Sequence, residues 1–175
     1  IHPVFAENII NIVDTGDLIY YLADGNLFYY DKKADENHYL SRNNKLNDVN
    51  VSQIFYNYDA RYLVVVYESG NIDVITSDGT VINAPDISKA DIDPKTINYI
   101  NFKDNKVYLA TGFGFAILNA NKDFEVIESQ NFGENITSIT EVSDFIIIGK
   151  ADGAFMSPKS LAMHSPSTFT KFHVQ

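Results

Sequence analysis

Short apolar runs recur along the chain at a regular interval, and a turn that contains glycine follows each of them. The runs are four or five residues long and cover 18–22, 63–67, 107–110 and 145–148. The glycines of the turns that follow lie 45, 44 and 39 residues apart, and they are Gly25, Gly70, Gly114 and Gly153. An interval of about 40–45 residues that carries about four strands is typical of a β-propeller blade.

The stretch 107–119 shows the repeated unit most clearly. Two short apolar strands flank a turn with Gly112 and Gly114, and we expect both glycines to adopt the positive φ that reverses the backbone. A short strand rich in Ile and Val precedes each apolar run, at 9–12, 51–54, 97–100 and 136–139.

The runs 63–67 and 145–148 are apolar continuously rather than at alternate positions. This pattern indicates strands whose two faces are both covered, as in a blade between two neighbours. A two-sheet sandwich would leave one face in water and would alternate, and a buried helix would need a longer run. Val65 lies in the middle of its run, so we expect it to be fully buried.

The remaining segments supply the other strands of each unit. Third strands are expected at 27–30, 72–76, 115–118 and 154–156, and outermost strands at 37–40, 80–83, 124–129 and 169–173. The longest link, 84–96, contains Pro85 and Pro94 and is expected to hold a single helical turn. The segment 157–168 contains two prolines and four serines, which predicts that the third strand of the fourth unit ends early in a loop.

We therefore predict an all-β protein in which residues 1–175 form a partial β-propeller of four consecutive four-stranded blades. The blades are expected at about 9–41, 51–84, 97–130 and 136–175. A row of blades that does not close leaves the outward faces of the first and last blades uncovered. Since a large exposed apolar face usually marks an interaction surface, we expect these faces to be covered by other domains of a longer chain or by other proteins. In the isolated chain, a homodimer would cover them.

Composition narrows the functional classes. The chain has 175 residues, enough for one domain with a sizeable core, and its hydrophobic share of 45% is that of a folded protein. The formal net charge of -10 argues against nucleic acid as a partner, because nucleic-acid-binding surfaces are basic. The absence of cysteine excludes disulfides and thiolate metal sites.

No apolar run approaches the length of about 18 residues that a membrane span needs. The sequence starts at Ile1 rather than Met, which leaves room for a removed signal peptide.

Three sets of residues resemble the N-terminal β-propeller of PorZ-like proteins, which are envelope proteins of Bacteroidetes linked in some species to the type IX secretion system. The sets are Tyr21-Leu22-Ala23-Asp24-Gly25-Asn26-Leu27-Phe28, Leu46-Asn47-Asp48 followed by 51–54, and Thr96-Ile97-Asn98 with Tyr108-Leu109-Ala110-Thr111-Gly112-Phe113-Gly114. The same patterns recur in the propellers of two-component regulators. The resemblance covers about residues 2–155.

The resemblance implies a periplasmic or surface-exposed protein with further propeller and sandwich domains, so the expected partners are those domains or other envelope proteins. The function that it favours is a non-enzymatic scaffold or interaction domain. The alternative is the ligand-sensing propeller of a hybrid two-component system that responds to glycans. A sugar-cleaving propeller is a third and weaker class.

No residue pattern in the sequence indicates a catalytic, cofactor-binding or metal-binding site. The four histidines have no ligand spacing and are expected at the surface or rim; they are His2, His38, His164 and His173. The pair Gly112 and Gly114 fails the dinucleotide pattern, because Ile117 stands where a third glycine belongs. Asp86, Asp91 and Asp93 lack the order of a calcium loop and are interpreted as a solvated linker.

Carboxylates near the turns after the second strands are the residues a sugar-cleaving propeller would use. Asp24, Glu68 and Asp152 occupy such positions, but sequence alone does not bring them together. Tyr21 and Tyr67 precede two of these turns, and we interpret them as blade packing rather than a sugar-stacking platform.

Overall fold

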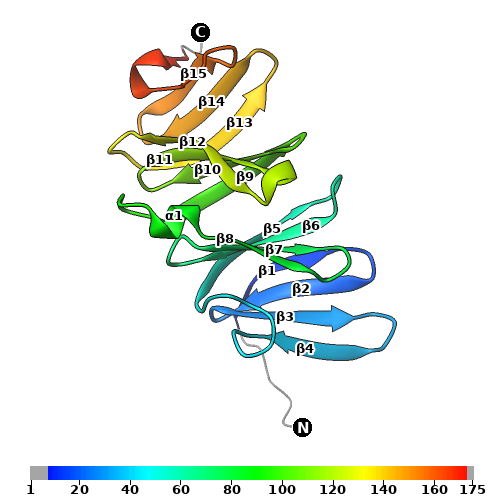
Figure 1. Ribbon diagram of the computed structural model, residues 1–175. Helices are drawn as coiled ribbons and strands as arrows, with labels where there is room; N and C mark the ends of the chain where they lie inside the picture. The colour runs from blue at the N-terminus through cyan, green and yellow to red at the C-terminus, as the bar shows by residue number, and fades with distance from the viewer. Residues whose placement is uncertain (1–7, 173–175) are drawn as a thin grey trace. The chain divides into compact units, whose positions relative to one another are not determined.

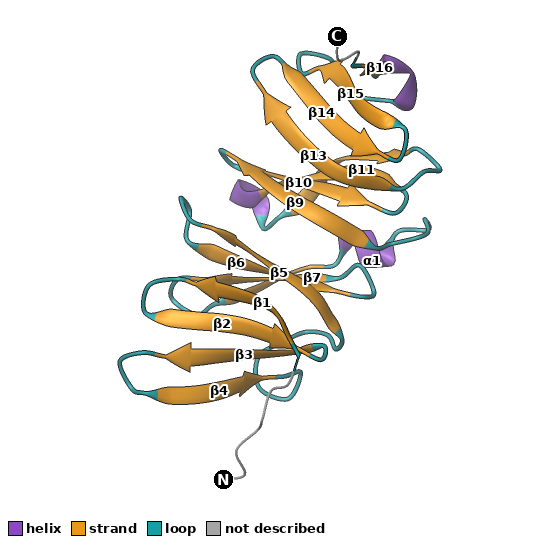
Figure 2. Cartoon of the chain, turned by 180° about the vertical axis from the view of Figure 1, so that it is seen from behind, coloured by secondary structure: helices purple, strands orange, loops and turns teal. Residues whose placement is uncertain are grey.

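The computed structural model describes residues 8–172, and within them the chain is all-β (Figures 1 and 2). Sixteen strands form four antiparallel sheets of four strands, and each sheet takes its strands in sequence order. This confirms the predicted all-β fold of four consecutive four-stranded blades. The first two sheets contain β1 (Ile9–Asp14), β2 (Leu18–Ala23), β3 (Asn26–Asp31) and β4 (Glu36–Leu40), then β5 (Val51–Asn57), β6 (Tyr62–Tyr67), β7 (Ile72–Thr76) and β8 (Val81–Ala84). The other two contain β9 (Ile97–Lys103), β10 (Lys106–Thr111), β11 (Gly114–Asn119) and β12 (Glu125–Asn131), then β13 (Ile136–Val142), β14 (Phe145–Lys150), β15 (Gly153–Pro158) and β16 (Thr170–Lys171).

The fourth sheet corrects one prediction. Its third strand does not end early, because β15 continues through Ser157 to Pro158 and reaches the same length as β11. Ser157 is fully buried and its hydroxyl bonds that of Thr168, which holds the serine-rich segment against the strand. Pro158 pairs with Phe145 at the end of the ladder, where a missing N–H is tolerated. The outermost strand, β16, is only two residues long, and the predicted continuation to 173 lies outside the described residues.

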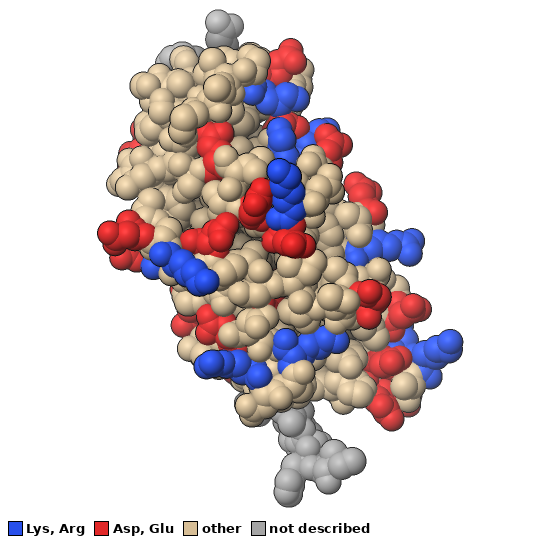
Figure 3. Space-filling model, in the orientation of Figure 1, with Lys and Arg blue, Asp and Glu red and all other residues tan. Residues whose placement is uncertain are grey.

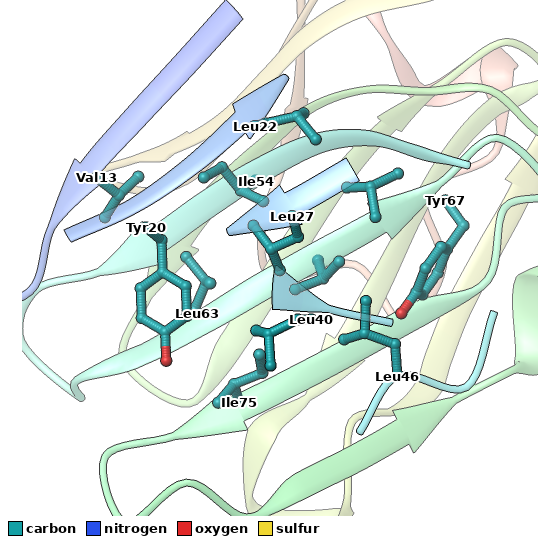
Figure 4. Close-up of a cluster of buried hydrophobic side chains, with 12 residues drawn as sticks. Val13, Tyr20, Leu22, Leu27, Leu40, Leu46, Ile54, Leu63, Tyr67 and Ile75 are labelled. Carbon is teal, nitrogen blue, oxygen red and sulfur yellow. The ribbon is translucent and has the colours of Figure 1, made fainter. Parts of the chain in front are cut away.

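The chain divides into two compact units, one ending at Ala84 and the other beginning at Pro85. In the first unit, apolar side chains from the sheet β1–β4 pack against those from the sheet β5–β8 (Figure 4). The core includes Leu22, Leu27, Leu63 and Val65, each at most 1% exposed. The innermost strands β1 and β5 are tied by a side chain, since Asn11 Nδ2 donates to the Ile54 carbonyl over 2.8 Å.

Strand β6 is buried along its whole length. Val65 is 0% exposed, which confirms the expectation for this position. The neighbouring strand β7 carries an unexpected charged group in the same core, because Asp73 is also 0% exposed.

The carboxylate of Asp73 is satisfied entirely by hydrogen bonds from neutral groups. Tyr67 Oη donates to Oδ2, as does the Asn47 backbone N–H over 2.8 Å. The side-chain amides of Asn47 and Asn83 donate to Oδ1 over 2.8 and 3.0 Å. Burial and the bond to Asp73 raise the pKa of Tyr67. This network fixes the segment before β5 against the second sheet.

The second unit has its own core between the sheets β9–β12 and β13–β16. Tyr108, Phe115, Ile136 and Ile148 form its centre, each 0% exposed. An asparagine side chain again joins the innermost strands, β9 and β13. Asn98 Nδ2 donates to the Ile136 carbonyl over 2.8 Å. In each unit, an asparagine of the first sheet therefore bonds a backbone carbonyl of the second sheet, although the two bonds lie at different positions along the strands.

The link that opens the second unit contains the single helical turn expected there, α1 (Asp86–Lys89). Asp86 is more than part of a solvated linker, because its carboxylate accepts a 3.0 Å hydrogen bond from the Val126 backbone N–H and so ties α1 to β12. Asp91 and Asp93 are exposed, as a solvated linker requires.

The turn between β10 and β11 corrects the prediction for Gly112. Only Gly114 has a positive φ, +154°, whereas Gly112 does not belong to the positive-φ residues. A Cβ at Gly112 would lie 3.1 Å from Pro94, so this glycine permits close approach of the link rather than a backbone reversal. The reversal is stabilised instead by Thr111 Oγ1, which accepts from the Phe113 and Gly114 backbone N–H groups.

Candidate interaction surface

The face of the sheet β1–β4 that points away from the core of the first unit carries a row of apolar and aromatic side chains. Ile12, Tyr21, Phe28 and Tyr39 are direct partners across the four strands and therefore lie on one face. Tyr21 stacks on Phe28 with ring centroids 5.2 Å apart, and Phe28 meets Tyr39 at 5.3 Å. Ile12 is 60% exposed and Tyr39 is 44% exposed. We call this surface the aromatic face.

Hydrogen bonds within the sheet hold the rings of the aromatic face in place. Tyr21 Oη donates to Asn37 Oδ1, and Tyr39 Oη donates to Asn26 Oδ1, both over 3.1 Å. Burial raises the pKa of Tyr21. Phe28 is only 5% exposed between the two tyrosines, so the apolar area that remains available comes from Ile12, Tyr21 and Tyr39. Because the tyrosine hydroxyls are satisfied at the edges, this area is preorganised and suits the packing of another sheet.

The second unit has an exposed apolar face of the same kind on its last sheet. Val142 pairs with Phe145, and Ile147 pairs with Met156, so the four share the face opposite the core of that unit. Val142 is 50% exposed and Phe145 is 38% exposed. The exposure of alternate residues in β14 is what the prediction of an uncovered outer face requires.

The predicted turn carboxylates are divided between the two units. Asp24 and Glu68 are both exposed in the first unit. The start of β5 contacts both of their turns, because the Val51 N–H donates to the Gly25 carbonyl and the Glu68 N–H donates to the Asn50 carbonyl. Asp152 belongs to the second unit, and its Oδ1 lies 3.8 Å from Lys150 Nζ.

The two tyrosines differ in role. Tyr67 is 1% exposed and packs in the core, as expected. Tyr21 is half-buried and lies on the aromatic face, so it packs within its own sheet and also contributes exposed ring surface.

The prediction for the histidines is wrong for His164. This residue is 5% exposed rather than at the surface. His38 does lie at the rim on β4, with Nε2 3.4 Å from Glu36. His2 and His173 lie outside the described residues.

His164 and Glu128 form a buried pair that joins the segment after β15 to β12. His164 Nδ1 lies 2.9 Å from Glu128 Oε1, and the His164 backbone N–H donates to Oε2 over 2.8 Å. Burial alone would raise the pKa of Glu128, but the hydrogen bonds from His164 and Gln130 outweigh it and lower the pKa. The two residues are 36 positions apart, and no local motif in the sequence marks them as partners.

Other kinds of site find little support in the described part of the chain. Residues 8–172 contain no group of three or more His, Asp or Glu side chains that could hold a metal ion. Among the same residues, no helix combines the length and apolar character that crossing a bilayer requires. Acidic and basic side chains are interspersed on the face shown in Figure 3.

Comparison with known protein families identifies the family of this chain. A family model described as TSS9, PorZ, N-terminal beta-propeller domain matches residues 19–167. The chain belongs to this PorZ family. The match includes strands from all four sheets, with β1 and β16 outside it, and confirms the resemblance seen in the repeated turns. No curated protein matches the chain.

Solved structures with a similar fold include a member of the same family. The structure of PorZ from Porphyromonas gingivalis, described as an essential bacterial surface component of the type-IX secretion system, is 27% identical with a TM-score of 0.86 and covers 97% of this chain. The extracellular domain of BT4673 from B. thetaiotaomicron, described as a hybrid two-component system, is 18% identical with a TM-score of 0.70 over 89% of the chain. The chain spans 23% and 21% of the lengths of these two proteins, and the second likeness shows the fold alone.

Proposed function

We propose that this PorZ-family propeller is a non-enzymatic scaffold and interaction domain of the bacterial envelope, which acts in type IX secretion. The observation that carries the proposal is the aromatic face, a preorganised apolar surface of a sheet with exposed Ile12 and Tyr39. Its occupant is a further β-sheet of the same envelope protein, since propeller blades stack face to face.

Two lines of evidence support the proposal. The PorZ structure at 27% identity is described as a surface component of a secretion system, which supports a location outside the cytoplasm for this chain. Within residues 8–172, the exposed side chains of Asp24 and Glu68 make no hydrogen bond or ion pair, which supports an interaction role rather than catalysis.

Chromosomal variants in a bacterium that carries this protein test the role. Ile12→Lys places a charge at an exposed position of the aromatic face, so the level of the protein should be preserved. Tyr39→Lys also places a charge there, but it removes the ring contact with Phe28 and the hydrogen bond to Asn26, so its protein level is compared with that of Ile12→Lys. We expect delivery of type IX cargo to the cell surface to fall in both variants, measured by surface proteomics with immunoblotting of the protein itself. Ile127→Lys, at a residue 50% exposed on β12, is the matched control and should leave delivery unchanged.

Two results would count against the scaffold role. Normal cargo delivery in both face variants at normal protein level would remove the aromatic face from the function. Normal delivery with a lost transcriptional response to added glycans would favour the ligand-sensing alternative instead.

A further inference from the structure

A hollow opens between the two sheets of the first unit, at the edge formed by the β1–β2, β5–β6 and β7–β8 turns. Its inner part has a volume of about 130 Å³ and lies against Leu18, Tyr20, Leu63 and Ile75. An outer part of about 510 Å³ shares Thr15, Asp17, Tyr56 and Arg61 with it and adds Tyr58. We call the two parts together the tyrosine hollow.

The inner part combines the apolar side chains of Leu18, Leu63 and Ile75 with polar groups that include Thr76 and Ser77, and it has unused hydrogen-bonding capacity. Tyr20 is only 7% exposed, and its ring lies beside Leu63 in the core (Figure 4). The hydroxyls of Tyr20 and Tyr56 have no hydrogen-bond partner among residues 8–172. Burial, with smaller effects of Tyr29 and Tyr56, raises the pKa of Tyr20 to about 12, so the hydroxyl keeps its proton and remains a donor. Both hydroxyls border the hollow, so they are free to donate to a ligand that carries an acceptor.

Arg61 is held at the mouth of the hollow by a rigid turn. Its backbone N–H donates to the Asn57 carbonyl over 2.7 Å, while Asn57 Oδ1 accepts from the Asp59 and Ala60 N–H groups. Arg61 has a φ of +58°, a conformation that costs a residue with a side chain about 1 kcal/mol.

The charges at the mouth are opposite in sign but not paired with each other. Asp17 and Arg61 line both parts of the hollow, yet their side chains form no ion pair or hydrogen bond with a described residue. Asp14, the other carboxylate at the mouth, is already paired with Lys32 at 2.9 Å. The mouth therefore offers one positive and one negative group to the same ligand.

We propose that the tyrosine hollow binds a free α-amino acid with an apolar side chain. The carboxylate pairs with Arg61 and accepts from the tyrosine hydroxyls, the ammonium group pairs with Asp17, and the side chain enters the apolar part between Tyr20 and Ile75. A sugar fits less well, because Tyr56 and Tyr58 meet edge to face at 86° and do not form a flat stacking platform. A fatty acid would leave Asp17 without a partner.

Calorimetric titration of the 175-residue chain tests the proposal with L-leucine and L-phenylalanine as probes. Both should bind, whereas leucinamide and N-acetyl-leucine should each bind at least about tenfold more weakly, the loss of one charge pair. Glycine has no side chain for the apolar part and should not bind measurably.

Two variants separate the roles of the charges. Arg61→Gln should weaken leucine binding by about tenfold or more, and the control Arg42→Gln, at the only other arginine of the chain, should not change it. Asp17→Asn should abolish the preference for leucine over N-acetyl-leucine. Circular dichroism melting of each variant confirms that the fold is kept.

Three outcomes would overturn the proposal. The first is that no probe binds at millimolar concentration. The second is that leucinamide binds as well as leucine, which removes the role of Arg61. The third is that N-acetyl-leucine binds as well as leucine, which would make the hollow a site for the carboxyl end of a peptide. None of these outcomes affects the scaffold role of the aromatic face.

Discussion

At the scale of the residue, the first unit depends on a buried carboxylate. Asp73 stands in the otherwise apolar strand β7 and is 0% exposed. An unpaired charge in this position would be very costly, but four hydrogen bonds from Tyr67, Asn47 and Asn83 satisfy it. The carboxylate thereby specifies where the segment before β5 lies.

Asp73→Ala is expected to lower the free energy of unfolding by roughly 3 kcal/mol or more, because it leaves several buried donors without an acceptor. Urea unfolding followed by tyrosine fluorescence measures the change. Asp59→Ala, at an exposed turn position, is the control and should stay within about 0.5 kcal/mol of the parent. An equally small effect of Asp73→Ala would mean that the network does not stabilise the fold.

The Glu128–His164 pair predicts a pH dependence. The pKa of Glu128 is lower in the folded protein than its ordinary value, so its contribution to stability is fully present above the unfolded-state pKa. That contribution is lost as the pH falls through the folded-state pKa. We expect the stability difference between the parent and Glu128→Gln to be largest near neutral pH and to shrink in the acid range below about pH 4.5. Urea midpoints at a series of pH values test this, and a difference independent of pH would contradict it.

Much at this scale could not be predicted from sequence. Val65 was predictable because its neighbours are all apolar, and the structure places it at 0% exposure. Asp73 could have been suspected from its place within an apolar strand, but its partner Asn47 is 26 positions away. His164 stands in a segment rich in serine and proline, and only the path of the chain brings it to Glu128. Such contacts follow from tertiary packing, which local patterns do not encode.

At the scale of the element, the spacing of the apolar runs predicted where the strands lie. The structure extends the first strands by two or three residues beyond the Ile and Val positions, for example β5 from Val51 to Asn57, because backbone pairing continues past the apolar side chains. In the last sheet, the side chains of β14 point alternately to the two faces. The first half of this strand is entirely apolar, but Phe145 and Ile147 face away from the core. A run of apolar residues therefore predicts a strand well and the cover on its second face less well.

The β10–β11 turn yields a prediction for this scale. A Cβ at Gly114 would lie 2.0 Å from the Gln130 carbonyl oxygen in the adjacent strand β12, and φ is +154°. Gly114→Ala should therefore force β11 and β12 apart and cost about 2–4 kcal/mol. Gly133→Ala, where φ is +61° but nothing lies within 4 Å, should cost only about 1 kcal/mol. Equal melting temperatures for the two variants would show that the tight contact is relieved without loss.

At the scale of the whole molecule, the central claim is that the aromatic face is a docking surface for another sheet. The face is built by one sheet, its rings are fixed by their own hydrogen bonds, and Ile12 and Tyr39 are exposed on it. In the isolated chain, the sheet available to cover it is that of a second copy, so self-association should replace the docking that we propose for the intact envelope protein.

Light scattering of the 175-residue chain against concentration tests this claim most directly. We expect the molar mass of a dimer at micromolar concentration, and the mass of a monomer, 19.7 kDa, for Ile12→Lys under the same conditions. Ile127→Lys should remain a dimer. A parent chain that stays monomeric throughout the micromolar range, or a dimer that Ile12→Lys leaves intact, would contradict the assignment of the aromatic face as the docking surface.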